Sequence, residues 1–222
     1  MSMYCDQCQE TLSNEACTDT GVCGKDAQTS NIQDLFVWEL KGLSYLAEEA
    51  RAEGIVDEDL RVFIAEGLFS TITNVNFDPE WFEEQIREGF ERRPDLRERY
   101  EREVGPIDEA ALPEAATWEA AESAAFYEKA PEVGVQTTEN EDIQSLRELL
   151  TYGIKGIAAY ADHAYVLGEE KDEVFAFVQR GLAATLDDEL SVDDLIGLVL
   201  EAGEIGTEVM ATLDEAHTST YG

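Results

Sequence analysis

Apolar residues recur at three- and four-residue spacing over most of the chain, which is the period of an amphipathic helix. The first such stretch opens at Ser30, which forms a predicted capping box with Gln33, and it ends at Gly54. A second helix is predicted from about Asp57 to Thr73. The pattern therefore begins with two helices joined by a glycine turn.

The helical period continues to the end of the chain. Asp78 and Pro79 predict the start of a third, strongly charged helix, which we expect to break at Pro94. An Ala/Glu-rich stretch over 114–130 predicts one further helix. Three more are predicted over 140–166, opened by Thr138 with Glu141, over 170–187, and over 192–215, opened by Ser191 with Asp194. No strand pattern is present, so the predicted fold class is all-α.

An internal repeat lies within this pattern. Displacing the chain by 114 residues superimposes three pairs of glycines, Gly42 on Gly156, Gly54 on Gly168 and Gly67 on Gly181. Gly54 and Gly168 suit helix ends that need a positive φ, whereas the four mid-helix glycines predict close approach of a neighbouring helix. Two similar helical hairpins are therefore expected.

The acidic excess bears on habitat and partners. Fifty Asp and Glu against 15 Lys and Arg give a formal net charge of -35. Such a chain repels itself in dilute buffer, while molar salt screens the repulsion, so a cytoplasm with very high salt is expected. Nucleic acid is disfavoured as a partner because no basic patch is available for phosphates. No apolar run approaches the 18 residues of a membrane span, so no membrane partner is expected.

All four cysteines fall within the first 23 residues, at spacing C-x2-C-x8-C-x5-C: Cys5, Cys8, Cys17 and Cys23. An iron–sulfur cluster, a zinc site and two disulfides are the alternatives. The iron–sulfur interpretation is favoured, because zinc ligands usually come as two close pairs and only the first pair here is close. Disulfides are disfavoured because nothing like a secretory signal precedes Cys5, and a cytoplasmic protein is expected.

The residues around these cysteines resemble a known family. YCDQCQET at 4–11, GVCGK at 21–25 and NIQDL at 31–35 are similar to the N-terminus of hybrid cluster proteins, also called prismane proteins or hydroxylamine reductases. YGIKGIAAYA at 152–161 and TYG at 220–222 are similar to later stretches of the same family's helical domain. The cysteine motif with its flanks is highly specific, and the helical matches add support.

The resemblance implies an all-helical domain of two three-helix bundles, in which the four cysteines hold a [4Fe-4S] cubane near the surface. Its x8 and x5 gaps match the branch of the family with the cubane, whereas another branch has longer gaps and a [2Fe-2S] centre. The expected segments are a cluster-binding loop over 1–30, a first helical hairpin over 31–78, charged helices of the intervening bundle over 79–137, and a second hairpin with the C-terminal helix over 138–222.

Family members continue for hundreds of residues beyond the stretch that resembles this chain. Their hybrid iron–sulfur–oxygen cluster, which reduces hydroxylamine to ammonia, is held there by a histidine, glutamates and further cysteines. The chain therefore resembles an excised domain, a truncated gene product or one half of a split protein.

The function expected from the resemblance is an electron relay. It would take electrons from an external donor of the reductase or ferredoxin type and pass them to a catalytic cluster, which a separate chain could carry. No catalytic residue is assigned within this chain, which is not expected to be a competent oxidoreductase alone. The alternatives are a zinc-stapled helical interaction module and a stand-alone ferredoxin-like carrier.

Other candidate residues have plainer interpretations. His163 and His217 are expected to be packed or half-exposed side chains rather than metal ligands. Lys25, beside Cys23, is expected to be solvated, with tuning of the cluster by its charge as the alternative. The three tryptophans are expected in the core or at an interface: Trp38, Trp81 and Trp118.

Overall fold

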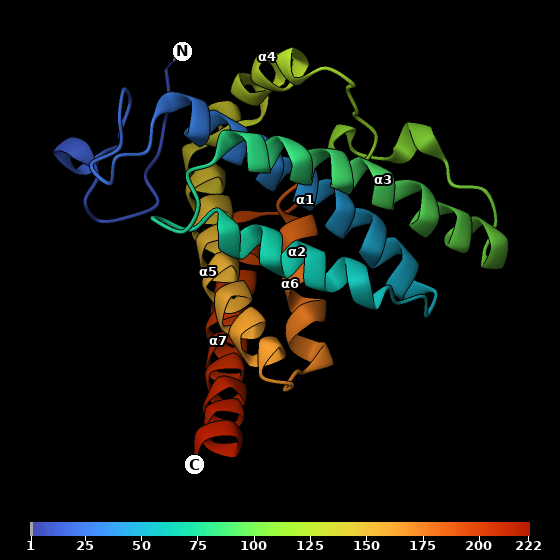
Figure 1. The fold of residues 1–222 in the computed structure, drawn as a ribbon. Helices are drawn as coiled ribbons and strands as arrows, with labels where there is room; N and C mark the ends of the chain where they lie inside the picture. The colour runs from blue at the N-terminus through green and yellow to red at the C-terminus, as the bar shows by residue number, and fades with distance from the viewer. Residues whose placement is uncertain (1) are drawn as a thin grey trace.

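The computed structural model describes residues 2–222 and confirms the all-α fold (Figure 1). Within these residues the α-helices are α1 (Ala27–Ala52), α2 (Glu58–Ser70), α3 (Pro79–Glu103), α4 (Ser123–Val133), α5 (Glu141–Val166), α6 (Asp172–Ala184) and α7 (Val192–Tyr221). Short 3-10 turns are η1 (Leu12–Asn14), η2 (Glu109–Ala111), η3 (Glu114–Ala116) and η4 (Val135–Thr137). No helix of the described part combines the length and apolar character that a membrane crossing needs.

The helices repeat at the offset that the glycines predict. α1 and α5 each have 26 residues and begin at 27 and 141, and α2 and α6 each have 13 and begin at 58 and 172. Both pairs are therefore displaced by 114 residues. The third helices, α3 and α7, begin 113 residues apart, at 79 and 192.

Equivalent helix ends are built in the same way. Gly54 and Gly168 have φ of +80° and +88°, as expected for glycines that end helices in the left-handed region. The hydroxyls of Thr71 and Thr185 donate to the carbonyls three residues earlier, both at 2.7 Å. The repeat therefore extends from sequence to individual hydrogen bonds.

The two halves interlock through one core. α1 packs on α3 of its own half and on α6 of the other, while α5 packs on α7 and on α2 (Figure 1). The cross-contacts α1–α6 and α5–α2 are equivalent under the repeat, so the halves meet like the subunits of a twofold dimer. Buried apolar side chains from both halves form a single cluster.

A buried ion pair joins α1, α3 and the segment after α3. Arg93 of α3 bonds Glu39 of α1 and also donates to the carbonyls of Ala115 at 3.0 Å and Trp118 at 2.5 Å. These carbonyls are consequently taken by a side chain instead of by helical N–H groups. The prediction of one helix over 114–130 is therefore wrong: η3 and an irregular stretch precede α4.

Two predicted capping boxes are also wrong. α1 begins before Ser30, because Asp26 is already extended and its carboxylate accepts from the Thr29 N–H at 2.8 Å. α5 is capped by Asn140 rather than by Thr138, since the Asn140 side chain accepts from two N–H groups of the first turn. The capping box of Ser191 with Asp194 is confirmed at the start of α7, which runs beyond the predicted residue 215.

The predicted break at Pro94 is wrong as well, because α3 continues through it. Proline removes one backbone donor. Its neighbours Arg93 and Leu96 are buried, at 5% and 2% exposed, so packing on both sides of the proline holds the helix together.

Close helix approach accounts for three of the four mid-helix glycines. A Cβ on Gly67 or Gly181 would lie 2.9 Å or 2.8 Å from a side chain of α1 or α5, and one on Gly42 would lie 1.9 Å from the Ala115 carbonyl oxygen. The prediction is wrong for Gly156, where a Cβ would meet nothing within 4 Å. The backbone of Ala115 contacts Gly42, whereas no described segment contacts the Cβ position of its repeat equivalent, Gly156.

Gly42→Ala and Gly156→Ala should consequently have opposite effects on stability. The first should lower the free energy of unfolding by about 1–3 kcal/mol because the methyl group overlaps the Ala115 backbone. The second should leave it unchanged or raise it by up to about 1 kcal/mol through helix propensity. Chemical denaturation followed by circular dichroism measures both, and equal losses would contradict the asymmetry.

Candidate metal centre

The four cysteines lie in the segment before α1, which is folded on itself by backbone bonds. Cys5 and Cys17 form an isolated antiparallel bridge in which each N–H donates to the other's carbonyl, at 3.1 Å and 2.9 Å. Residues opposed in this way have Cα atoms about 5.5 Å apart and side chains on the same face. The bridge therefore brings together two thiols that are 12 positions apart in sequence.

A second bridge, Thr20–Asp26, closes a tight loop around Cys23. Gly24 in this loop has φ of +93°, a conformation that favours glycine. A Cβ on Gly21 would lie 3.0 Å from the Cys23 sulfur, so the thiol packs directly over the Gly21 backbone. Both glycines are thus needed to hold Cys23 in its turn.

The donor set suits a metal centre, although the side chains are not gathered on one point. All four thiols are free, Cys17 is buried and the other three are partly exposed. Among residues 2–222, no group of three or more His, Cys, Asp or Glu side chains stands close enough to hold a metal ion. Four free thiols on two bonded loops fit the donor sets of both iron–sulfur clusters and four-cysteine zinc sites.

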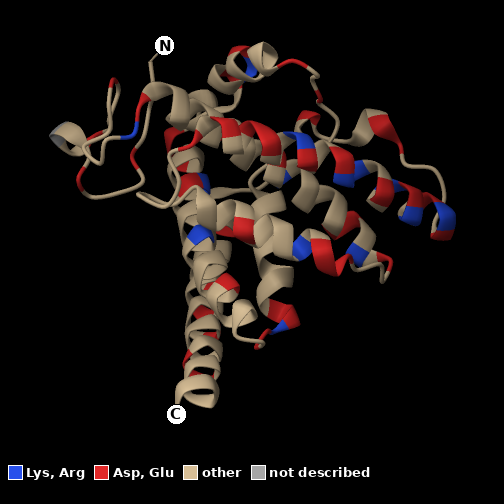
Figure 2. Cartoon of the chain, in the orientation of Figure 1, with Lys and Arg blue, Asp and Glu red and all other residues tan. Residues whose placement is uncertain are grey.

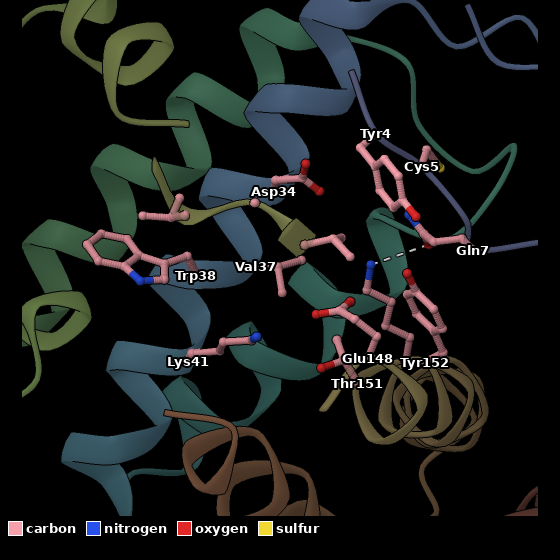
Figure 3. A pocket seen from close by; sticks show the side chains of 14 residues that line it. Tyr4, Cys5, Gln7, Asp34, Val37, Trp38, Lys41, Glu148, Thr151 and Tyr152 are labelled. Carbon is pink, nitrogen blue, oxygen red and sulfur yellow. Dashed lines mark hydrogen bonds between the residues drawn. The ribbon is translucent and has the colours of Figure 1, made fainter. Parts of the chain in front are cut away.

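The cysteine segment is held on the helices by its polar residues. The Tyr152 hydroxyl of α5 donates to the Asp6 carboxylate. Lys155 donates to the Gln7 side-chain oxygen at 3.3 Å, the bond drawn as a dashed line in Figure 3. Burial raises the pKa of Tyr152, so this hydroxyl stays protonated and can donate. Asp6 and Gln7 are the two residues between Cys5 and Cys8, so the hydrogen bonds from α5 hold the C-x2-C turn directly.

Lys25 anchors the other end of the segment. It is only 2% exposed and donates to the Gln33 side-chain oxygen at 2.5 Å, while Gln33 in turn donates to the Asn76 carbonyl at 2.9 Å. The expectation of a solvated Lys25 is therefore wrong, because the turn at Gly24 directs this side chain into the protein.

Two buried lysines thus lie near the first thiol. Burial raises the pKa of Cys5, while the charges of Lys25 and Lys155 oppose that rise. Burial, together with the neighbouring charge of Lys25, lowers the pKa of Lys155 to about 8. In a chain of net charge -35, these ammonium groups provide local compensation for anionic sulfur.

A small cavity of about 30 Å³ lies beneath the segment, between α1 and α5 (Figure 3). Four pairs of its lining residues are equivalent under the 114-residue repeat: Asp34 and Glu148, Val37 and Thr151, Trp38 and Tyr152, Lys41 and Lys155. Burial raises the pKa of Asp34 to about 7, opposed mainly by the charge of Lys155. The cavity therefore lies on the pseudo-twofold axis, and the cysteine segment covers it.

Sequence reasoning missed this cavity, although its signal was present. The offset of 114 that aligns the glycines also aligns the four lining pairs. Equivalent residues of the two halves make different contacts. Tyr152 donates a hydrogen bond to Asp6, whereas its equivalent Trp38 packs edge-on against Trp118.

The histidines are not among the residues that line the cavity, and both are exposed, so the expectation of packed or half-exposed side chains is wrong. His163 is exposed and meets the Phe69 ring edge-on, with centroids 5.2 Å apart. His217 lies beside Tyr221 near the end of α7. The three tryptophans pack against the core, as predicted.

Comparison with known proteins places the fold and its cysteine segment in a family. Residues 3–222 match the Prismane/CO dehydrogenase family, and the chain belongs to it. The resemblance to hybrid cluster proteins, inferred from the cysteine motif, is thereby confirmed.

Curated relatives share about half of the residues. The chain is 53% identical to a protein of Kosmotoga olearia, 50% to one of Natranaerobius thermophilus and 51% to one of Desulfitobacterium hafniense strain DSM 10664 / DCB-2, each named "Hydroxylamine reductase". All of this chain is aligned, but only 40–41% of each relative. The chain thus spans about two fifths of the length of these relatives.

Removing the Tyr152 hydroxyl should loosen the cysteine segment without unfolding the helices. A hydrogen bond to a charged group contributes about 1.5–3 kcal/mol, so amide exchange in residues 4–8 of Tyr152→Phe should accelerate about 10- to 100-fold. Tyr160→Phe, on the exposed side of the same helix, is the matched control. Unchanged exchange in residues 4–8 of Tyr152→Phe would show that this contact does not hold the turn.

Proposed function

We propose that this chain is the electron-relay part of a hydroxylamine-reductase-type oxidoreductase, with a [4Fe-4S] cluster on Cys5, Cys8, Cys17 and Cys23. The observation that carries the proposal is the cysteine segment itself. Four free thiols lie on two backbone-bonded loops, in a chain of the Prismane/CO dehydrogenase family. The cluster supplies one-electron oxidation and reduction when bound.

The chain's own residues position the ligands and offset their charge. Tyr152 and Lys155 hold the turn between Cys5 and Cys8, and the Cys5–Cys17 bridge puts those two thiols on one face. The buried Lys25 and Lys155 counter the negative charge of the thiolates, so reduction adds an electron next to fixed positive charge. Three thiols remain partly exposed, which suits electron entry from an external reductase or ferredoxin at the surface.

The proposed partner is the polypeptide that holds the catalytic cluster. Cleavage of the N–O bond of hydroxylamine takes two electrons and needs an open metal position for the substrate, whereas four thiolates close a cubane. Apart from the four cysteines, no group of three or more His, Cys, Asp or Glu side chains stands out among the described residues as a candidate metal site. We assign to this chain delivery of electrons rather than turnover of the substrate.

Protein purified without oxygen should contain about four iron and four sulfide per chain, because four thiolates complete the coordination of a cubane. Reduction by dithionite should produce a paramagnetic signal typical of a reduced cluster. Cys17→Ser should abolish or convert the cluster while leaving most of the helical circular dichroism, since the helices have their own core. Stoichiometric zinc without iron, in a colourless protein, would overturn the proposal in favour of a zinc-stapled module.

The isolated chain should not produce ammonia from hydroxylamine above the level given by free iron and sulfide. The assay uses reduced viologen as donor under strict anaerobiosis, with fusion to the remaining part of a relative as the positive control. A chain that reduces hydroxylamine robustly alone would refute the relay assignment, even if its cluster is intact.

We also propose that the protein works in a cytoplasm with very high salt. In Figure 2 the red of Asp and Glu is spread over much of the ribbon, whereas the blue of Lys and Arg is most frequent on α3. That helix carries six of the 15 Lys and Arg residues. The rest of the molecule has few positive charges, so its acidic residues repel one another.

The melting temperature should rise steeply between low salt and about 1 M salt, where the Debye length falls to about 3 Å. Loss of helicity or aggregation is expected in dilute buffer. Melting curves at matched pH measure the effect. A melting temperature that does not depend on salt would count against the proposed habitat.

A further inference from the structure

One side of α5 is exposed to solvent, although the equivalent side of α1 under the repeat is covered by other segments. The backbone of Ala115 lies so close to Gly42 that a Cβ there would be 1.9 Å from its oxygen, whereas Gly156 meets nothing within 4 Å. The same scaffold position is therefore occupied in one half and empty in the other.

The neighbouring side chains follow the same asymmetry. Leu35 and Leu46 of α1 are 0% and 3% exposed, but their equivalents Leu149 and Tyr160 of α5 are 53% and 43% exposed. In the first half, α1 is covered by α3, α4 and η3. The described residues put no counterpart of α4 or η3 over α5.

A stripe on α7 extends this bare surface. Ile196, Leu200 and Met210 are 41%, 67% and 50% exposed, and with Gly203 they recur at helical spacing. α7 packs along α5, and Ala202 lies 3.7 Å from the Cβ position of Gly153. We call the combined surface the α5–α7 face; it consists of Leu149, Gly153, Gly156, Tyr160, Ile196, Leu200, Gly203 and Met210.

None of the eight residues of the α5–α7 face is charged, although 29% of the chain is. An apolar surface of this kind in a strongly acidic protein marks a site that another protein covers. An uncharged face is also the part of this molecule on which a partner can settle without burying unpaired carboxylates.

We infer that the α5–α7 face is the docking surface for the part of the hydroxylamine reductases that has no counterpart in this chain. The aligned segment makes up 41% of the Kosmotoga olearia relative, so about three fifths of that protein lies outside it. Backbone of that part approaches Gly156 as the Ala115 backbone approaches Gly42. This inference does not depend on the identity of the cluster.

Carbene labelling tests the inference directly, because it modifies exposed side chains of any type. The chain alone is compared with a chimera in which it replaces the aligned 41% of the Kosmotoga olearia relative. Labelling of Tyr160 and Leu200 should fall several-fold in the chimera. Tyr165, on another side of α5 and similarly exposed at 41%, is the internal control and should keep its labelling.

Variants separate docking from folding. Gly156→Leu should leave the melting temperature of the chain alone unchanged or raised, yet restore labelling of Tyr160 in the chimera because the new side chain blocks the approach. Gly197→Leu is the matched control, since Gly197 is an exposed glycine of α7 outside the face that also meets nothing within 4 Å. Its labelling pattern should equal that of the unaltered chimera.

Full labelling of Tyr160 in the chimera would overturn the inference, as would protection that survives Gly156→Leu. Protection in the chain alone that grows with concentration would assign the face to a second copy instead, and would likewise overturn it. If the chimera does not fold, the intact relative is labelled at the residues aligned with Tyr160 and Tyr165, and the same difference is required. The iron content of each sample reports the cluster proposal separately.

Discussion

The reciprocal packing of two long helices against the opposite half is the constraint on which the rest of the structure depends. α1 rests on α6 and α5 rests on α2, and these contacts are equivalent under the 114-residue repeat. Each half alone would leave one side of its long helix exposed, so neither hairpin is a complete domain. The cavity on the pseudo-axis and the cysteine segment above it both follow from this arrangement.

The contacts that hold the cysteine segment are made at positions where the two halves differ. Of the equivalent residues Trp38 and Tyr152, the second has a hydroxyl that holds the C-x2-C turn, and of Lys41 and Lys155, the second bonds Gln7. One half of the duplicated scaffold thus supplies the seat for the thiols. The other half is closed by the Glu39–Arg93 pair, which holds the η3 segment over α1.

The features that were predicted correctly depend on the apolar periodicity of the sequence and on the positions of its glycines. The helix ends at Gly54 and Gly168, the offset of 114 residues and the all-α class are properties of local conformation or of a pattern repeated along the chain. The family followed from the cysteine spacing and its flanks, which are local features of the sequence. None of these features depends on which segments meet in space.

The two wrong helix starts were decided by the local caps of Asp26 and Asn140, and the other failures by tertiary contact. Arg93 takes the carbonyls that a helix over 114–130 would have used, and its burial on α1 keeps α3 intact past Pro94. Lys25 is buried because a turn directs it inward, which its neighbours in sequence do not reveal. Gly156 has the same sequence context as Gly42 but lacks its contact, so only the structure distinguishes them.

The central claim is that the cysteine segment holds an iron–sulfur cluster above the cavity between α1 and α5. Crystals grown without oxygen, measured on both sides of the iron absorption edge, test it most directly. We predict one compact anomalous peak within bonding distance of the sulfurs of Cys5, Cys8, Cys17 and Cys23. A zinc-edge peak in its place, or four thiols with no anomalous density between them, would contradict the account.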